Sequence, residues 1–561
     1  MENVRLLLIA TLFFLGLLIY QAWQKDYGTT TGSAEISETS VAVGESEFSE
    51  REDTDKQVDV PRIDNFDGTL TPKPIGRANS DIRGLETSPE GKVIKVSTDL
   101  FSATVNLKGG SLERVVLKKY PVDPKDQTVT VELLGSSRNK VYLQQGGLQG
   151  PADFPQHNDY YETERESFEL LPSENELIVP MFWSRGDEIK VTKSLVFRRD
   201  DYKIDVSYRV QNLTNEPIRV RHYEQLKRNE VSSRQGMIYT FSGAALSIPN
   251  KRFEKFDFDD LRDNPIDVKA ADGWIGVLQH YFVSALMAPS GIVYRYYSMV
   301  LPDNIFIIGL QSDAYLIGSG EELTFGSSLY VGPKTHARLE QQTDGMELAV
   351  DYGILWFIAK PLFIMLSFFY EIGGNWGWAI IALTVLIKLL FYPLSAAGYR
   401  SMANMRKVQP RMLALRDRYK EDKAQLNQAM MKLYKDEKIN PLGGCFPILV
   451  QIPVFIALYW VLLESVEIRQ APFILWITDL SSKDPYFVLP LLMGISMWGQ
   501  QKLNPAPMDP IQAKVMQVLP FVFTVFFAFF PSGLVLYWLV NNILSIAQQW
   551  RITHLIEKNN K

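Results

Sequence analysis

Long apolar runs occur only near the two ends of this chain of 561 residues, and short alternating runs fill the region between them. Residues 6–19 are almost uninterrupted apolar, and the other long apolar runs follow after residue 350. In between, segments such as 202–208 alternate apolar and polar side chains, which is typical of half-buried antiparallel β-strands. The pattern predicts a multi-domain membrane protein with a large antiparallel β-sandwich domain over residues 91–345 and a helical membrane core over residues 346–561.

The N-terminal apolar run has the layout of a secretion signal but lacks a cleavage site. A signal peptide that is removed needs small residues soon after its apolar region. Here the only nearby small residue is Ala22, and bulky Tyr20 stands two positions before it. We therefore predict an uncleaved transmembrane anchor over residues 1–25 with a cytoplasmic N-terminus. Residues 26–90 are rich in Ser, Thr, Glu, Asp and Pro, which predicts a flexible linker on the exported side.

Charge divides the chain at the same place as hydrophobicity. Residues 26–350 hold 36 Lys and Arg against 50 Asp and Glu, a net charge of −14, whereas residues 351–561 hold 20 against 13, a net charge of +7. The composition, with 46% hydrophobic and 22% charged residues, excludes a disordered or fibrous chain. The division supports a membrane protein that carries an acidic soluble insert.

The C-terminal third contains more apolar runs than can all cross the membrane. The stretch 399–440 is strongly basic, so we expect it in the cytoplasm, and an odd number of spans must separate it from the exported domain. We place 352–371 on the outer surface as an interfacial helix, because Lys360 and Pro361 stand at its middle. The five predicted core spans are 376–397, 442–463, 486–501, 515–530 and 534–550. With the anchor they make six transmembrane α-helices, and the charges of the loops predict a cytoplasmic C-terminus.

Lys388 is the most informative residue of the core, because it interrupts the apolar run 376–397. It stands twelve residues before Arg400, which in a straight helix is a depth of about 18 Å. Burying a lysine at such depth costs about 2.5–3.5 kcal/mol on insertion scales. One interpretation is a side chain that extends to the headgroups. Tyr392 and Pro393 support it, because they suggest a membrane interface nearby. We favour the other, a charge beside a water-filled cavity inside the bundle.

Other predicted spans supply polar side chains that such a cavity needs. They are Thr384, Gln451, Gln500, Thr524, Asn541, Asn542, Ser545 and Gln548. Each alone is more often a contact between helices, but together they form one hydrated wall in our interpretation. The predicted core spans contain no acidic residue, so the charge at position 388 is expected to be available to an incoming acidic or polar chain.

The basic stretch 399–440 has the apolar periodicity of two short helices joined by a turn at 420–423. We predict a cytoplasmic helical hairpin whose methionine-rich faces suit adaptable packing. The basic side chains expected to make contacts there are Arg406, Lys407, Arg411, Arg416 and Arg418. A spacer held at anionic headgroups and a contact with ribosomal RNA remain open as alternatives.

We find no pattern that predicts catalysis. The single Cys445 excludes an intramolecular disulfide, and the five histidines have no ligand spacing, so no metal site is expected. The carboxylates at 257–263 lack the glycine and terminal glutamate of a calcium loop, which favours a solvated acidic face. His280 is expected to be a hydrogen-bonded structural residue. No nucleotide-binding motif occurs, so we expect no cofactor and no intrinsic ATPase.

Three segments resemble the signature segments of the YidC family of bacterial membrane protein insertases. They are Asn440–Pro447 (NPLGGCFP), Arg469–Phe473 (RQAPF) and Phe530–Trp538 (FPSGLVLYW). The resemblance of the core covers about residues 350–555, and the whole plan is similar to the form found in Gram-negative inner membranes. On that plan residues 26–350 are periplasmic.

The resemblance implies a five-helix core around a hydrophilic groove that is open to the cytoplasm and to lipid but closed on the outer side. It implies one positive charge in the groove, usually arginine, at the position of Lys388, and groove aromatics at Tyr537 and Trp538. Lysine keeps the charge but lacks the planar fork of arginine. The implied partners are nascent membrane proteins, the Sec translocon, the ribosome and the phospholipid bilayer, with no small-molecule substrate, and the implied function is insertase and chaperone.

Two functions from other classes compete with this one. A secondary transporter would use Lys388 as its substrate site, but transporters usually show two related halves with matching broken helices. A periplasmic binding or scaffold protein would use its spans only as anchors. Deletion of residues 92–340 distinguishes the last from an insertase, whose core should largely keep its activity.

Overall fold

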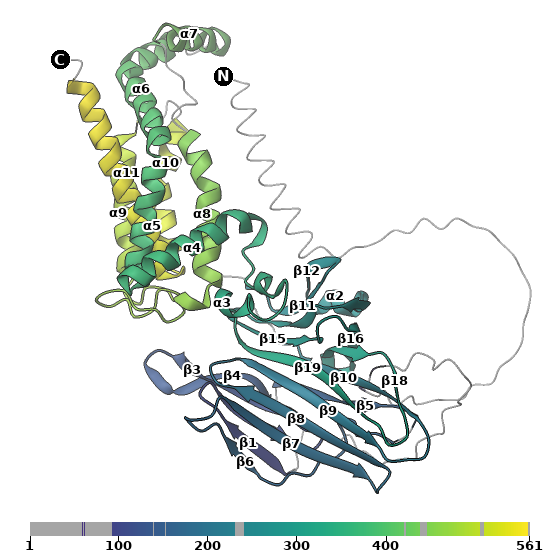
Figure 1. Cartoon of the computed structure of the whole chain (residues 1–561). Coiled ribbons are helices and arrows are strands. Elements are labelled where there is room, and N and C mark those ends of the chain that lie inside the picture. The colour runs from purple at the N-terminus through teal and green to yellow at the C-terminus, as the bar shows by residue number, and fades with distance from the viewer. Residues whose placement is uncertain are drawn as a thin grey trace, which may run out of the picture.

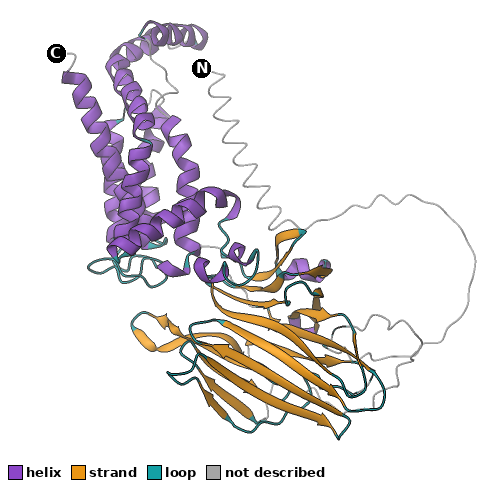
Figure 2. Ribbon diagram, viewed as in Figure 1, coloured by secondary structure: helices purple, strands orange, loops and turns teal. Residues whose placement is uncertain are grey.

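The computed structural model describes residues 59, 61, 92–137, 140–151, 153–230, 240–419, 422–437, 446–504 and 510–558. The predicted anchor at 1–25 lies outside these residues, and so does the linker at 26–90 apart from Asp59 and Pro61. The described chain forms two bodies, a domain made of strands and a bundle made of helices, joined by a short helical region (Figures 1 and 2).

The strands form two facing sheets that share one core. In the described residues one sheet has 11 strands in the order β13-β16-β17-β10-β5-β4-β3-β2-β1-β6 with β18 on β10, and the other has 8 in the order β12-β11-β14-β15-β19-β9-β8-β7. Their bounds are β1 Val93–Ser97, β2 Phe101–Asn106, β3 Ser111–Asp123, β4 Asp126–Ser137, β5 Lys140–Gln149, β6 Ser167–Glu169, β7 Glu176–Arg185, β8 Ile189–Arg198, β9 Lys203–Asn212, β10 Ile218–Asn229, β11 Gly243–Ile248, β12 Lys251–Phe256, β13 Asp267–Ala271, β14 Trp274–Leu278, β15 Phe282–Met287, β16 Val293–Leu301, β17 Ile305–Ser312, β18 Tyr315–Ile317 and β19 Glu322–Pro333.

The predicted β-sandwich is confirmed, and alternation explains it. Along β8 every second side chain from Ile189 to Phe197 is buried, as a strand with one face on a core requires. One pairing departs from the antiparallel prediction, because β6 joins β1 in parallel. A pair of parallel strands needs a crossover, and here a long connection through other strands separates the two.

The helices follow the predicted apolar runs with shifted ends. Their bounds are α2 Phe258–Asp263, α3 His336–Leu339, α4 Trp356–Gly373, α5 Trp376–Leu390, α6 Tyr392–Arg418, α7 Lys423–Asp436, α8 Phe446–Glu464, α9 Val488–Leu503, α10 Pro510–Phe527 and α11 Ser532–Lys558, with short 3₁₀ turns η1 Pro302–Asn304, η2 Met346–Ala349, η3 Gly353–Leu355 and η5 Val466–Ile468. Figure 1 shows α5, α8, α9, α10 and α11 side by side as a bundle.

Helix α4 lies across the end of this bundle that is nearer to the β domain (Figure 1). Together with η3 it is, by itself, the one described helix that is long and apolar enough to cross a membrane, over Gly353–Gly373. Its one charged side chain within the apolar run, Lys360, forms an ion pair of 2.9 Å with Glu340, which follows α3 of the β domain. Large apolar side chains such as Ile364 and Phe368 are exposed on it. A polar contact with the domain and an exposed apolar face favour the interfacial position, which stays a prediction.

The predicted span 376–397 is broken in the structure. Helix α5 ends at Leu390, α6 begins at Tyr392, and the two axes differ by 67°. Pro393 stands in the first turn of α6, where its missing N–H and fixed φ suit a helix start. The depth of about 18 Å for Lys388 assumed a straight helix and therefore does not hold. Lys388 lies in the last turn of α5.

Helices α6 and α7 pack against each other at the position of the predicted helical hairpin. Val408 and Met412 of α6 pack on Met430 and Tyr434 of α7 in a small buried cluster. Helix α6 continues through Pro410 without a break. The hairpin extends from the end of the bundle that is remote from the β domain (Figure 1). Its cytoplasmic location stays a prediction.

The other end of the bundle is fixed to the β domain by buried polar contacts. Lys334, after β19, forms an ion pair of 3.1 Å with Glu464 at the end of α8, and both side chains are buried. The Nε2–H of His280 donates to the carbonyl of Leu463 at 2.9 Å, so this histidine has the structural role predicted for it. Arg469, in the loop after α8, donates to the carbonyl of Pro121 in β3 at 2.7 Å.

Candidate functional site

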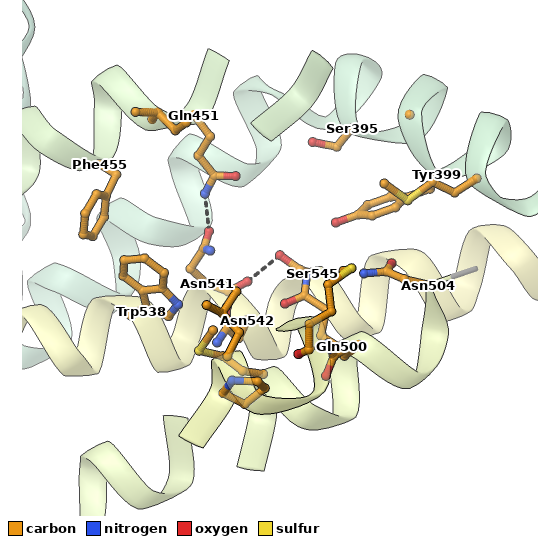
Figure 3. Close-up of a pocket in the computed structure, with 18 of the residues that line it drawn as sticks. Ser395, Tyr399, Gln451, Phe455, Gln500, Asn504, Trp538, Asn541, Asn542 and Ser545 are labelled. Atoms are coloured by element: carbon orange, nitrogen blue, oxygen red, sulfur yellow. Dashed lines mark hydrogen bonds between the residues drawn. The ribbon is translucent and has the colours of Figure 1, made fainter. Parts of the chain in front are cut away.

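A cavity of about 420 Å³ opens between α6, α8, α9, α10 and α11 (Figure 3). Its polar lining residues are Ser395, Tyr399, Gln451, Gln500, Gln501, Asn504, Asn541, Asn542 and Ser545. Apolar and aromatic side chains fill the spaces between them, among them Phe455, Met497, Leu519, Tyr537 and Trp538. A polar wall inside an otherwise apolar bundle distinguishes this cavity from ordinary helix packing.

Helix α11 supplies the polar wall because its amides and hydroxyls recur at helical spacing. Asn541 and Ser545 are four residues apart and share a face, and the hydroxyl of Ser545 donates to the carbonyl of Asn541 at 2.7 Å. From α8, the Nε2 of Gln451 donates to the Oδ1 of Asn541 at 2.6 Å (Figure 3). Asn542 turns toward α9, where its Nδ2 donates to the hydroxyl of Ser496 at 3.0 Å. These bonds hold the polar wall in place.

Lys388 reaches this wall from α5. Its ammonium donates to the hydroxyl of Ser545 at 2.7 Å, so the side chain points across to α11 and not out to the headgroups. Within the part of the chain that the structure describes, no carboxylate lies within ion-pairing distance of it. A cation whose one hydroxyl partner lines a cavity keeps attraction for an incoming anion. This contact fits the second of the two interpretations of Lys388, which stays a prediction.

The cavity lies at the end of the bundle that is remote from the β domain. Its lining residues come from the beginning of α8 and α10 and from the end of α9, where the hairpin begins. The opposite end is filled by the loop 465–487, whose backbone accepts from the N–H groups of Ser532 and Gly533 at 2.7 and 2.9 Å. The side chain of Asn375, which caps α5, also donates into this loop. The bundle is therefore hollow at one end and packed at the other.

The structure brings together most of the residues predicted for the groove. Gln451, Tyr537, Trp538 and Asn541 line the cavity, and Lys388 touches it through Ser545. Three predicted polar residues, Thr384, Thr524 and Gln548, do not line it. The hydroxyl of Thr384 is buried and donates to the carbonyl of Ile380 at 2.6 Å, and that of Thr524 donates to the carbonyl of Pro520 at 2.7 Å. Both threonines satisfy their hydroxyls within their own helices.

Sequence reasoning missed the contribution of α6. Ser395, Gly398 and Tyr399 line the cavity only because the chain bends between α5 and α6 and turns the first turns of α6 toward the bundle. The available signal was Pro393, read as an interface marker and not as a helix start.

The basic residues predicted on the hairpin are mostly exposed. Arg406, Lys407, Arg411 and Arg418 are exposed and Arg416 is half-buried. Arg411 forms an ion pair of 2.5 Å with Glu437, and the guanidinium of Arg418 lies over the ring of Tyr419. Contacts of these side chains with a partner stay a prediction.

The acidic stretch of the β domain has a structural explanation. Asp257 caps α2 and exchanges hydrogen bonds with Asp260, and Arg262 pairs with both Asp259 and Glu230. Among the described residues no group of three His, Cys, Asp or Glu is arranged to hold a metal ion. The carboxylates act as a cap and as ion-pair partners.

Comparison with known proteins agrees with this architecture. The family described as the 60Kd inner membrane protein matches residues 368–559, and the YidC periplasmic domain matches residues 93–365. The membrane protein insertase YidC of Thioalkalivibrio sulfidiphilus is 46% identical over 100% of both chains. Those of Methylococcus capsulatus and Alkalilimnicola ehrlichii are 45% and 46% identical, over 100% and 99% of this chain and 99% and 96% of theirs. The chain therefore belongs to the YidC family of membrane protein insertases.

Proposed function

We propose that this chain inserts membrane proteins into the inner membrane through the cavity between α6, α8, α9, α10 and α11. The observation that carries the proposal is the position of Lys388, a cation without a carboxylate partner in the described chain, which donates to Ser545 in the wall of a polar cavity near the hairpin end. The related proteins are named as insertases, which is a non-enzymatic function, and the proposal needs no catalytic residue.

In the proposed mechanism the polar end of a nascent membrane protein enters the cavity, attracted by Lys388 and solvated by Gln451, Asn541 and Ser545. This lowers the cost of moving polar groups into the bilayer. The apolar segment that follows passes along α9 and α10 into lipid. Burial of its apolar surface supplies the driving force, at about 25 cal/mol per Å².

The proposed topology places the hairpin and both termini in the cytoplasm and residues 26–350 in the periplasm. It includes six spans, with the anchor at 1–25 as the first and α4 along the outer surface. The exposed basic side chains on α6 are placed to meet ribosome-bound chains or anionic headgroups. Work beside the Sec translocon belongs to the same proposal and rests on membership of the family.

The test is insertion of a small single-span substrate with an acidic tail into Sec-free proteoliposomes. Lys388→Ala is expected to lower the initial rate about tenfold, which corresponds to about 1.4 kcal/mol. Lys388→Arg should stay near wild type because it keeps the charge. Ser545→Ala removes the hydroxyl partner but not the charge, so a smaller loss is expected. Lys269→Ala, in an exposed ion pair of the β domain, is the matched control.

Two results would count against the proposal. Equal rates for wild type and Lys388→Ala would remove the charge from the mechanism but leave the insertase. Wild-type protein no better than empty vesicles would overturn insertion without Sec and favour a helper role.

A further inference from the structure

A short piece of the predicted linker lies against the 11-stranded sheet of the β domain. The carboxylate of Asp59 accepts from the Nε2 of His157 at 3.0 Å and from the ammonium of Lys227 at 2.8 Å. The Nε2 of Gln225 donates to the backbone carbonyl of Asp59 at 2.9 Å. Two residues on, the Nε2 of Gln149 donates to the carbonyl of Pro61 at 3.2 Å, and Pro61 is buried.

The groups that hold this segment are buried and oriented by other residues. Gln225 of β10 accepts at its Oε1 from the hydroxyl of Tyr297 at 2.7 Å. Gln149 of β5 accepts at its Oε1 from the Nε2 of Gln311 at 2.8 Å. Because each amide oxygen already has a donor, each NH₂ group is left to donate to the linker backbone. The two amides form a fixed cradle for the backbone carbonyls of Asp59 and Pro61.

His157 and Lys227 recognise the acidic side chain. The His157 ring is almost fully buried, and its Nδ1 hydrogen-bonds the hydroxyl of Tyr223 at 2.7 Å, which leaves Nε2–H for the carboxylate. Burial raises the pKa of Asp59, but the hydrogen bond from His157 and the charge of Lys227 outweigh it, so the pKa is well below its usual range. Beside Asp59 the site continues as a cavity of about 310 Å³ lined by Asn106, Lys108 and Tyr160.

We propose that this face of the β domain is a binding site for an acidic peptide and that the chain itself occupies it with Asp59 and Pro61. The recognised pattern is an aspartate followed two positions later by proline. The contacts read one carboxylate and two backbone carbonyls.

Docking divides the linker and shortens the connection between the anchor and the β domain. Residue 25 is 67 positions from residue 92, where the described domain begins, but only 34 positions from Asp59. For the flexible linker that the sequence predicts, the typical distance spanned falls from about 45 Å to about 32 Å. The predicted anchor is thereby kept closer to a defined face of the domain.

The test uses trypsin on the full-length protein in detergent, with cleavage sites followed by mass spectrometry. Arg62 stands next to the docked segment, and Arg77 stands farther along the same linker. We expect cleavage after Arg62 to be at least about tenfold slower than cleavage after Arg77 in wild type. Lys227→Gln should raise the ratio of the two rates, cleavage after Arg62 divided by cleavage after Arg77, about tenfold. Since Lys227 is on the sheet, this substitution leaves the sequence that trypsin reads unchanged.

Lys269→Gln is the matched control, because it removes a charge and an ion pair from the same sheet without touching the linker. The ratio of the two rates should not change in this variant. Equal cleavage at both sites in wild type, or an unchanged ratio in Lys227→Gln, would overturn the proposal. Both rates come from the same molecules, so each variant is its own reference. A partly unfolded variant would be recognised by faster cleavage within the β domain. For such a variant, Asp59→Asn gives the same test from the linker side.

Discussion

The buried ion pair between Lys334 and Glu464 gives the sharpest test of how the two bodies are joined. Its atoms are 3.1 Å apart, and the two side chains are 3% and 6% exposed. Lys334 follows the last strand of the β domain, and Glu464 ends α8 of the bundle. The perturbation is Lys334→Met, which keeps most of the side-chain volume and removes the charge.

The expected loss follows from the burial of the partner. Removing the ammonium leaves the carboxylate of Glu464 buried and uncompensated, which destabilises by about 3–5 kcal/mol. The double substitution Lys334→Met with Glu464→Leu removes both charges and should return stability to within about 1–2 kcal/mol of wild type. The exposed pair of Lys269 and Asp313, at 60% and 55% exposure, is the control, and Lys269→Met should cost less than about 1 kcal/mol.

The assay is urea unfolding of the purified full-length protein in detergent, with the free energy compared across the four proteins. A cost for Lys334→Met no larger than that of the surface control would refute the reasoning, because it would mean that water reaches the pair. A double variant as unstable as the single one would refute it too, since the loss would then come from packing and not from the unpaired charge.

Two further predictions concern the loop after α8 and the start of α5. Burial raises the pKa of Glu467 to about 7 from 4.5, so its neutral form is favoured in the fold. The stability that the neutral carboxyl of Glu467 contributes to the fold is fully present below about pH 4.5 and is lost as the pH rises through 7. Glu467→Gln should therefore flatten the thermal stability profile between about pH 5 and pH 8, and an unchanged profile would contradict the assignment. A Cβ on Gly377 would lie 2.0 Å from the ring of Phe473, so Gly377→Ala should cost about 1–3 kcal/mol. Phe473→Leu should restore part of that loss in unfolding experiments, and no rescue would exclude the steric cause.

Patterns with a local cause were predictable from the sequence. Alternation along segments such as 202–208 gave the β-sandwich, because each strand has one face on the core. The hairpin followed from apolar periodicity, and the cluster of Val408, Met412, Met430 and Tyr434 lies at the positions that the period selects. Helix ends moved by several residues because hydropathy does not register caps.

Features that depend on distant residues were not predictable. The bend at Phe391 lies inside a continuous apolar run, so hydropathy alone joined α5 and the start of α6. The contact of Lys388 with Ser545 joins residues 157 positions apart. The docked residue Asp59 stands in a polar stretch that by composition predicts only a linker, and its partners on β5 and β10 can be recognised only once the sheet is formed.

The geometry of the bundle relates the cavity to the length of the helices. Lys388 stands 12 positions after Trp376 in helix α5, a rise of about 18 Å, which is well short of the ~30 Å of hydrocarbon in a typical bilayer. Helix α9 has 16 residues and a length of about 24 Å, so the membrane beside it is expected to be thin. In the proposed mechanism, a polar segment that reaches Lys388 from the hairpin end has only the packed part of the bundle between Lys388 and Trp376, about 18 Å, left to cross. In the proposed mechanism the cation and the short helices lower the same barrier. The cation attracts and solvates the polar end, and the short helices shorten its path through apolar surroundings.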